Sequence, residues 1–313
     1  MAAVAALIPR HSAGDTAKAA AKKKVNFPKA CPTLWQGTGR PRAQDGRETV
    51  FLCYAKFVLS HNNKAKIPDW VIERLHKKHL GKHEWPRPGF KPDDRIPKDA
   101  RAVDDDYENV GPAGYMARGH MAPAEDFDYS QQYTEQTFYL SNVVPQIGAH
   151  FNGSIWKTLE EIVRDAAKER TEIRIITGPI RGKDGKRTYT IKKSENKCGN
   201  EIDLEGPPMA LICKDRNNKK LATTCTAGVT VPIALYKIVY DTKEGTAHAF
   251  VLPNKEHPSR TKAAARKYLE DSRATVAAIE QVTGLKFFLN LKGAKRKRVV
   301  EDCEPTQLWR TEP

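Results

Sequence analysis

Two residues that together can cut a phosphate ester stand two positions apart in the sequence. Arg118 and His120 are separated only by Gly119, in the segment Ala-Arg-Gly-His. An arginine can hold a phosphate through two parallel hydrogen bonds, and a neutral imidazole, with an ordinary pKa of about 6.5, can accept a proton from water. The segment therefore predicts hydrolysis of a phosphate ester, with His120 as the candidate general base.

A second group of polar residues follows downstream. Asn142 begins the segment Asn-Val-Val-Pro-Gln, and Asn152 and Glu160 come after it. An amide oxygen is a neutral hard donor of the kind that Mg²⁺ accepts as a ligand. Taken alone, Asn152 could be only a helix cap and Glu160 an exposed helix residue. Their order after His120 favours a metal-assisted site.

The elements predicted around these residues are two strands and a helix. Residues 114–121 are expected to form a short strand and turn that presents His120, and residues 136–142 a second strand. A helix is expected from Gly153, with Asn152 at its start and Glu160 two turns later. Its core-facing stripe has helical spacing and comprises Trp156, Leu159, Val163 and Ala166.

The rest of the chain predicts an α+β fold. Residues 50–60 read as a strand, residues 68–79 as a helix with Pro68 in its first turn, and the proline-rich residues 85–106 as an extended loop. A helix capped by Ser272 is expected to end at Gly284. A central antiparallel sheet is expected to contain residues 172–177, 208–213, 230–241 and 246–252.

At this point the sequence resembles a known family, the DNA/RNA non-specific endonucleases, or ββα-metal (His-Me finger) nucleases, of the type of Serratia nuclease and mitochondrial endonuclease G. The matching blocks come in order over residues 50–291. They are most similar to bacterial members in that order. The blocks are Leu52-Cys53-Tyr54, Ile67–Val71, Arg118–His120, Asn142–Gln146 and Ile279–Phe288.

The resemblance implies a role for each candidate residue. His120 is expected to be the general base and Asn152 the direct ligand of Mg²⁺, with Mn²⁺ as the alternative ion. Glu160 is expected to hold metal-bound water, and Asn142 to orient the base or its loop. Two arginines, Arg118 and Arg87, are expected to clamp the phosphate. No nucleotide cofactor is implied.

One position departs from the family pattern. Most members carry aspartate immediately before Arg-Gly-His, and here that residue is Ala117. The missing carboxylate puts in doubt how the metal-bound water or the histidine loop is ordered. One of Asp104, Asp105 and Asp106 could supply a replacement charge.

Composition favours a nucleic-acid partner and excludes a membrane span. The chain has 313 residues, with 53 Lys and Arg against 38 Asp and Glu, a formal net charge of +15. Such an excess attracts polyanions without choosing a sequence. No apolar run is long enough to cross a membrane. We therefore expect DNA and RNA as partners and no membrane contact; a homodimer is a further expectation, and an inhibitor protein cannot be identified from sequence.

The domain is expected to lie between two tails. Residues 1–30 read as a disordered N-terminal tail of unresolved targeting meaning, residues 31–291 as the endonuclease domain, and residues 292–313 as a basic C-terminal tail. The six cysteines allow 15 disulfide pairings, of which Cys31 with Cys53 would tie the N-terminal lead to the first strand. A secreted or periplasmic location is modestly favoured, and organellar and cytoplasmic locations stay open.

The predicted function is metal-dependent endonucleolytic hydrolysis of DNA and RNA. Two alternatives remain open at this stage: a catalytically inactive, basic nucleic-acid-binding protein on the same fold, and a nuclease delivered as a toxin or effector. The trio His76, His79 and His83 has helical spacing for a transition metal, but a solvent-facing basic segment is the favoured interpretation because no acid or cysteine joins it.

Overall fold

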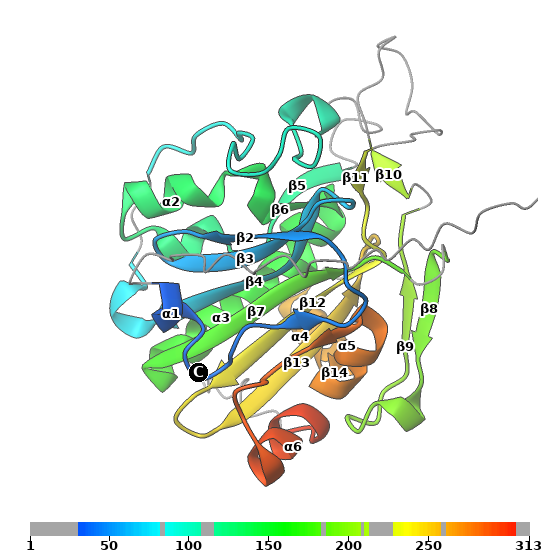
Figure 1. Cartoon of the computed structure of the whole chain (residues 1–313). Helices are drawn as coiled ribbons and strands as arrows, with labels where there is room; N and C mark the ends of the chain where they lie inside the picture. The colour runs from blue at the N-terminus through cyan, green and yellow to red at the C-terminus, as the bar shows by residue number, and fades with distance from the viewer. Residues whose placement is uncertain are drawn as a thin grey trace, which may run out of the picture.

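A seven-stranded antiparallel sheet forms the centre of the molecule in the computed structural model (Figure 1). The structure describes residues 31–81, 85–107, 116–182, 186–207, 210–212, 228–257 and 261–304. The expected tail over residues 1–30, together with His83, Cys213 and Cys225, lies outside this part of the chain. From one edge to the other the strands are β14 (Arg273–Ala274), β13 (Thr246–Pro253), β12 (Ala234–Asp241), β7 (Glu172–Ile180), β4 (Ile67–His76), β3 (Phe57–Asn62) and β2 (Thr49–Cys53).

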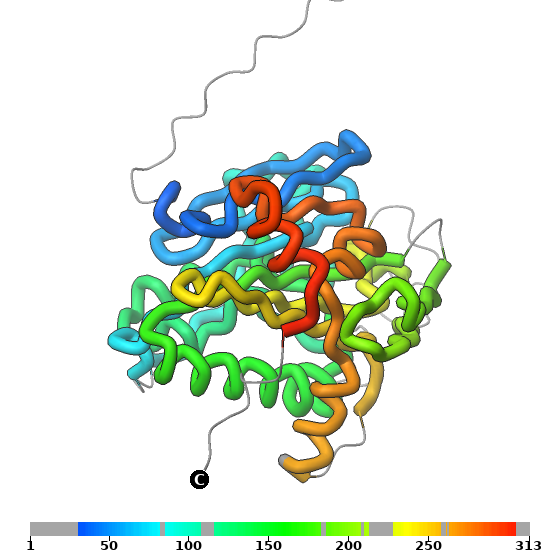
Figure 2. Tube along the Cα trace, turned by 90° about the horizontal axis from the view of Figure 1, so that it is seen from below, coloured from blue at the N-terminus to red at the C-terminus, as the bar shows by residue number. Residues whose placement is uncertain are grey.

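Each face of this sheet has its own hydrophobic core. On one face the sheet packs against the long helix α3 (Lys157–Arg170) and against α4 (Lys262–Asp271). On the other face it packs against α5 (Val276–Thr283) and α6 (Gly293–Glu301). Figure 2 shows α3 and α6 on opposite sides of the sheet. The molecule therefore has three layers, and the expected α+β class with a central antiparallel sheet is confirmed.

The remaining elements are short and lie around this frame. The two-stranded sheets are β1 (Arg42–Ala43) with β15 (Leu285–Lys286), β5 (Met116–His120) with β6 (Val143–Ile147), β8 (Thr188–Ile191) with β9 (Ile202–Glu205), and β10 (Leu211–Ile212) with β11 (Val229–Thr230). The short helices are α1 (Cys31–Leu34), α2 (Gln131–Thr137), and the 3₁₀ turns Lys77–His79, Asp104–Tyr107, Ala124–Phe127, Leu140–Asn142 and Lys193–Glu195.

The helix predicted over residues 68–79 is wrong. These residues form β4, a strand buried on both faces, followed by the 3₁₀ turn Lys77–His79. A strand that is buried on both faces shows a continuous apolar run instead of alternation, so its period does not distinguish it from a buried helix. Pro68 is tolerated because the register of β3 and β4 shifts at this point, and proline is accepted at such irregularities.

Several predicted boundaries also differ. Residues 50–60 form two strands of a hairpin, β2 and β3, instead of one strand. Of the strand expected over residues 208–213, the described residues Leu211 and Ile212 form β10, which pairs with β11 and not with the central sheet. The cap of α5 is Thr275, whose hydroxyl accepts from the amide of Ala278, and α5 does end at Gly284, whose φ of 68° suits glycine.

Two disulfides fasten the ends of the described chain to the domain. Cys31 bonds to Cys53, as the sequence had suggested, and Cys198 bonds to Cys303. The segment expected to be a basic tail begins with α6, in which Val299 and Val300 are buried against the sheet. This part of the C-terminal region is therefore packed on the domain. In the described part of the chain, no helix is long and apolar enough to cross a membrane.

Candidate active site

The candidate residues gather on two strands and a helix that follow one another on one side of the sheet. Strand β5 pairs antiparallel with β6, so that His120 lies opposite Val143. From Ile147 the chain enters a π-helix (Gly148–Trp156) that contacts β5 and continues directly as α3. His120 thus ends the first strand, Asn152 lies in the π-helix, and Glu160 lies in the first turn of α3.

Two details of this element differ from the sequence prediction. The second strand is β6 and not residues 136–142, which form the end of α2 and a 3₁₀ turn. The helix begins before Gly153, and its first part is π-helical instead of α-helical. Short π-helical insertions are rare and occur often at functional sites. Pro145 is accommodated inside β6 because the sheet has only two strands and the other edge of β6 needs no ladder hydrogen bond.

Gly119 is required by the close approach of β6. A Cβ atom at this position would lie 2.1 Å from Cδ of Gln146, which is fully buried. Contacts under 3.0 Å are essentially never observed for real Cβ atoms. The glycine in Arg-Gly-His, next to His120 in the sequence, therefore leaves room for the buried side chain of Gln146.

Replacement of Gly119 by alanine is expected to lower the free energy of unfolding by about 1–3 kcal/mol, the usual cost of overpacking a buried site. Thermal melting of the purified variant measures the change. The variant Gly119→Ala with Gln146→Ala removes the atoms that the new methyl group meets, so it should recover part of the lost stability. Equal melting of Gly119→Ala and wild type would contradict this account of the glycine.

His120 is partly enclosed by aromatic rings. Its ring centroid lies 4.8 Å from that of Phe138, edge to face, and 5.2 Å from that of Phe90. Its Nε2 atom is buried and has no hydrogen-bond partner among the described residues. Burial lowers the pKa of His120 to about 4, and the cation of Arg87 adds to this shift while the carboxylate of Glu125 opposes it. The imidazole is thus neutral near pH 7 and able to accept a proton.

Asn152 and Glu160 lie on the same helical segment, about two turns apart. Both side chains are partly exposed, and no hydrogen bond to another described residue holds either one. Burial raises the pKa of Glu160 to about 8; Asp126 and Glu125 raise it further, whereas Lys237 and Arg164 oppose the shift. A nearby divalent cation would favour the ionised carboxylate.

Glu125 links the histidine to the helix. Its charge acts on the pKa of both His120 and Glu160, so all three groups lie within electrostatic reach of one another. Arg87 lies beside them, 3.7 Å from Oε1 of Glu125 and joined through both Nη atoms to the carboxylate of Asp128, at 2.8 and 3.2 Å. The structure therefore brings His120, Glu160 and Arg87 into one neighbourhood.

Arg118 is held by a carboxylate from the preceding loop. Its Nη2 lies 2.8 Å from Oδ1 of Asp104, and its guanidinium lies over the rings of Phe90 and Tyr107. Asp104 is one of the three acids considered as a substitute for the missing aspartate at Ala117. It reaches the Arg-Gly-His segment, but it pairs with the arginine.

Asn142 is fully buried and fully hydrogen-bonded. Its Oδ1 accepts from the amide of Ala122, and its Nδ2 donates to the carbonyls of Ala122 and Thr137, each at 3.0 Å. The backbone of Ala122 comes two residues after His120. This geometry holds the loop that follows the histidine and leaves the amide no free group for substrate.

A buried charged cluster behind the site was not predicted from sequence. Lys237 on β12 is 1% exposed, donates to Oγ1 of Thr177 at 2.9 Å and lies 4.9 Å from the ring centroid of Trp156. Glu73 on β4 is 2% exposed, and neither of its carboxylate oxygens has a hydrogen-bond partner among the described residues. Burial, reinforced by the charge of Asp126, raises the pKa of Glu73 well above its usual range.

This cluster reaches α3 through an ion pair. Arg164, one turn after Glu160, donates to Asp126 at 2.8 Å. The signal in the sequence is a lysine inside the apolar run Ala-Leu-Tyr-Lys-Ile-Val-Tyr, since lysine is almost never fully buried without a partner. The positive charges of Lys237 and Arg164 both act on Glu160 and favour its ionised form.

Comparison with known proteins settles the family. The family model described as DNA/RNA non-specific endonuclease matches residues 40–294, most of the chain. The chain belongs to the DNA/RNA non-specific endonuclease family. Members similar to it include a mitochondrial nuclease of Saccharomyces cerevisiae, 30% identical over 79% of this chain, and Nuclease C1 of Cunninghamella echinulata, 29% identical over 78% of this chain.

Other family members differ in length from this chain. The mitochondrial nuclease EXOG of Xenopus laevis is 30% identical over 82% of this chain, but the match spans only 63% of the Xenopus protein, 68% of the yeast one and 84% of the Cunninghamella one. A crystal structure of the EndoG/EndoGI complex matches with a TM-score of 0.65 and 25% identity, covering 88% of this chain and 96% of that one. The nearness to bacterial members stays a prediction.

The donors at the site fit a hydrated divalent cation of this family of nucleases. Mg²⁺ keeps several waters and is commonly bound through only one or two protein oxygens. Asn152, a partly exposed residue, offers an amide oxygen, and Glu160, also partly exposed, offers a carboxylate about two turns away. In the described part of the chain, no three His, Cys, Asp or Glu side chains form a group that could hold a metal.

Proposed function

We propose that this chain hydrolyses phosphodiester bonds of DNA and RNA endonucleolytically, without sequence or sugar specificity and with the help of a divalent cation. The observation that carries the proposal is the strand–strand–helix element. It presents the unpartnered Nε2 of His120 and the free amide of Asn152 from adjacent segments, with Glu125 acting electrostatically on both His120 and Glu160.

The reaction begins with proton removal from water. His120 accepts the proton at Nε2, and the water oxygen forms a bond to phosphorus in line with the 3′ oxygen, whose bond to phosphorus breaks. The departing 3′ oxygen takes a proton from solvent water, so the products are a 5′ phosphate and a 3′ hydroxyl. Burial holds His120 neutral, and the rings of Phe90 and Phe138 fix its orientation.

The cationic residues neutralise the phosphate during attack. Arg118 and Arg87 are each paired with a carboxylate, so each guanidinium is held in place and keeps further N–H donors for phosphate oxygens. A bound Mg²⁺ or Mn²⁺ would act as a Lewis acid on the phosphate. Asn152 would hold this ion through its amide oxygen, and Glu160 would accept hydrogen bonds from its waters.

The compartment and the protein partners of this chain are also part of the proposal. The yeast and Xenopus relatives are named as mitochondrial nucleases, and the two disulfides here favour an oxidising compartment. The structural neighbour was solved with EndoGI, which supports a test for an inhibitor partner of this chain. A homodimer stays an expectation from the resemblance.

Cleavage of circular DNA and of a structured RNA tests the proposal. Wild-type protein with Mg²⁺ should nick the plasmid and cut the RNA internally, and EDTA should abolish both reactions. A catalytically inactive binding protein would retain both nucleic acids without cutting either, whether or not metal is added. That result would contradict the proposed activity.

The pH dependence should follow the depressed pKa of His120. A general base works only when deprotonated, so lowering the pKa from its ordinary value extends activity toward acid. The rate should therefore stay level from neutral pH to below 6, and the acid limb of kcat/KM should have a midpoint near the lowered pKa of about 4, because this ratio reports the free enzyme. Stability must be measured at each pH as a control. A midpoint at or above about 6.5 would show that His120 is not buried as described.

A further inference from the structure

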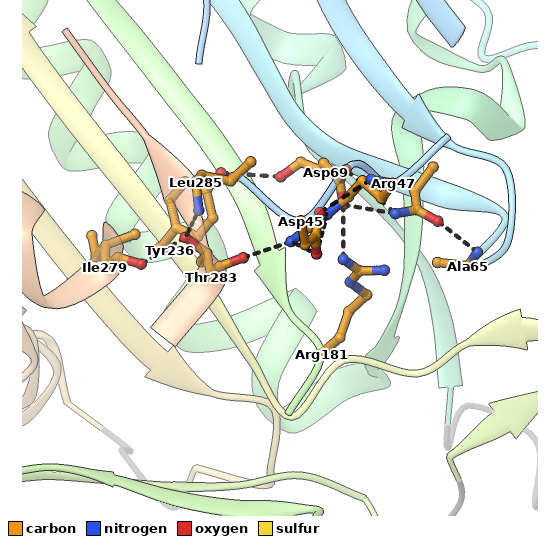
Figure 3. Close-up of polar contacts among 10 residues, drawn as sticks. Asp45, Arg47, Ala65, Asp69, Arg181, Tyr236, Ile279, Thr283 and Leu285 are labelled. Carbon is orange, nitrogen blue, oxygen red and sulfur yellow. Dashed lines mark hydrogen bonds and ion pairs between the residues drawn. The ribbon is translucent and has the colours of Figure 1, made fainter. Parts of the chain in front are cut away.

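A polar cavity lies beside β4 and the end of β7 in the central sheet. Its volume is about 600 Å³, and its lining shares no residue with the candidate catalytic and metal-binding groups. We call it the Arg181 cavity. Its charged lining consists of Asp45, Arg47, Lys64, Asp69 and Arg181, and the end of α5 with the first residue of β15, from Gln281 to Leu285, lines one side. Figure 3 shows Arg47 and Arg181 approaching Asp69 from different sides.

One buried carboxylate forms ion pairs with two guanidiniums in this cavity. Asp69, 3% exposed, lies 3.1 Å from Nη1 of Arg47 and 3.2 Å from Nη2 of Arg181. Asn62 also donates to both oxygens of this carboxylate, at 3.2 and 3.3 Å. The acceptor capacity of Asp69 is therefore largely used.

The two arginines differ in how completely they are partnered. Arg47 also forms an ion pair with Asp45 at 2.6 Å and donates to the carbonyl of Thr283 at 3.0 Å. Arg181 has one ion pair with a described residue, the long one to Asp69, and its side chain is 26% exposed. A guanidinium carries five N–H donors in a planar fork. Most of the donors of Arg181 therefore remain available to a ligand.

The charge of the cavity favours an anion. Three cations, those of Arg47, Arg181 and Lys64, face the two carboxylates of Asp45 and Asp69, so one positive charge is left without a counter-charge in the lining. Burial lowers the pKa of Arg181; the charge of Asp69 opposes this shift, and the positive charge of Arg47 adds to it. A bound anion would be favourable here for two reasons. It would replace the water that burial removes from Arg181, and it would offset the repulsion between Arg47 and Arg181. Lys64, exposed at the turn between β3 and β4, adds positive charge at the rim.

We propose that the Arg181 cavity binds a phosphate-bearing anion, with the free edge of the Arg181 guanidinium as its principal donor and Lys64 at its rim. A planar guanidinium fork matches two oxygens of one phosphate group. The phosphate can belong to a nucleic-acid strand or to a free phosphate compound, because both present the same chemistry. Binding here does not depend on hydrolysis at His120, so the inference stands apart from the proposed activity.

Calorimetric titration in EDTA tests this site with two probes, inorganic pyrophosphate and a single-stranded phosphorothioate DNA of eight nucleotides. The test variant is Arg181→Gln, which leaves Asp69 paired with Arg47. Loss of one charge-assisted contact should weaken binding about tenfold. Arg181→Lys keeps the charge but loses the fork, so it should fall between wild type and Arg181→Gln. The matched control is Lys267→Gln, which removes one positive charge from the exposed face of α4 and should change binding less than twofold.

The two probes separate the sources of the phosphate. If Arg181→Gln weakens both probes, a nucleic-acid phosphate can enter the cavity, whereas weakening of pyrophosphate alone identifies a free phosphate compound; both results support the site. Equal binding of both probes by Arg181→Gln and wild type overturns it. Should Arg181→Gln melt too early to titrate, Lys64→Gln provides the test, with about threefold weaker binding expected and no change as the contrary result.

Discussion

Replacement of His120 by alanine is expected to lower the rate of metal-dependent plasmid cleavage by about 10²- to 10⁴-fold, the range of a positioned general base. The expectation rests on the buried, unpartnered Nε2 and on the lowered pKa, which together give a neutral imidazole with a free lone pair. Substrate binding should change little, because phosphate contacts are assigned to the arginines. The loss should therefore appear in kcat and not in KM.

A second histidine provides the matched control. His76 lies at the end of β4, where its Nδ1 accepts from the amide of Lys78, outside the candidate site. His76→Ala removes the same chemical group and should cleave within about twofold of wild type. Comparable losses in His120→Ala and His76→Ala, or a His120→Ala variant that cuts at the wild-type rate, would remove His120 from the mechanism.

Replacement of Asn152 by alanine is expected to lower the rate at least about 100-fold and to raise the concentration of Mg²⁺ needed for half-maximal activity. A metal acting as a Lewis acid contributes several kcal/mol to the transition state, and each 1.36 kcal/mol is a factor of about ten. Asn152 is the only direct protein ligand that we assign, so the variant has no replacement. Rates measured over a wide range of Mg²⁺ separate weaker metal binding from slower chemistry.

Ser154 provides a control in the same π-helix. Its Oγ is buried and has no hydrogen-bond partner among the described residues, so Ser154→Ala should leave both helix and rate nearly unchanged. A large loss in Ser154→Ala would mean that any change in the π-helix disables the site. An unaltered Mg²⁺ requirement in Asn152→Ala would contradict its role as ligand.

The order of the site elements could be predicted from sequence, and their exact bounds could not. The residues flanking His120 and the stripe after Gly153 identified a strand and a helix. Residues 136–142 looked like the second strand, but that strand begins at Val143 and contains Pro145. Proline is disfavoured in the inner strands of a wide sheet because it cannot donate a backbone hydrogen bond. Both strands of a two-stranded sheet are edge strands, so this restriction does not apply to β6. β4 was assigned to a helix because burial on both faces removes the alternation that identifies strands.

The electrostatic environment of the site could not be predicted because it depends on contacts between distant segments. Lys237 on β12, Glu73 on β4 and Asp126 meet only when the sheet forms and α3 packs on it. Asp104 comes from a loop whose path has no periodicity. The wide turns of the π-helix, which carry Asn152, leave no mark in a pattern analysis based on 3.6 residues per turn.

The most direct test of the central claim is the cleavage rate of the double variant His120→Ala with Asn152→Ala. If the imidazole and the amide act on the same phosphate in one step, removing the second after the first should cost little, because residues that act as a unit have non-additive effects. The account predicts a double variant about as slow as the slower single variant, with its fold confirmed by melting. A loss equal to the product of the two single losses would show that His120 and Asn152 act independently, and would contradict the account.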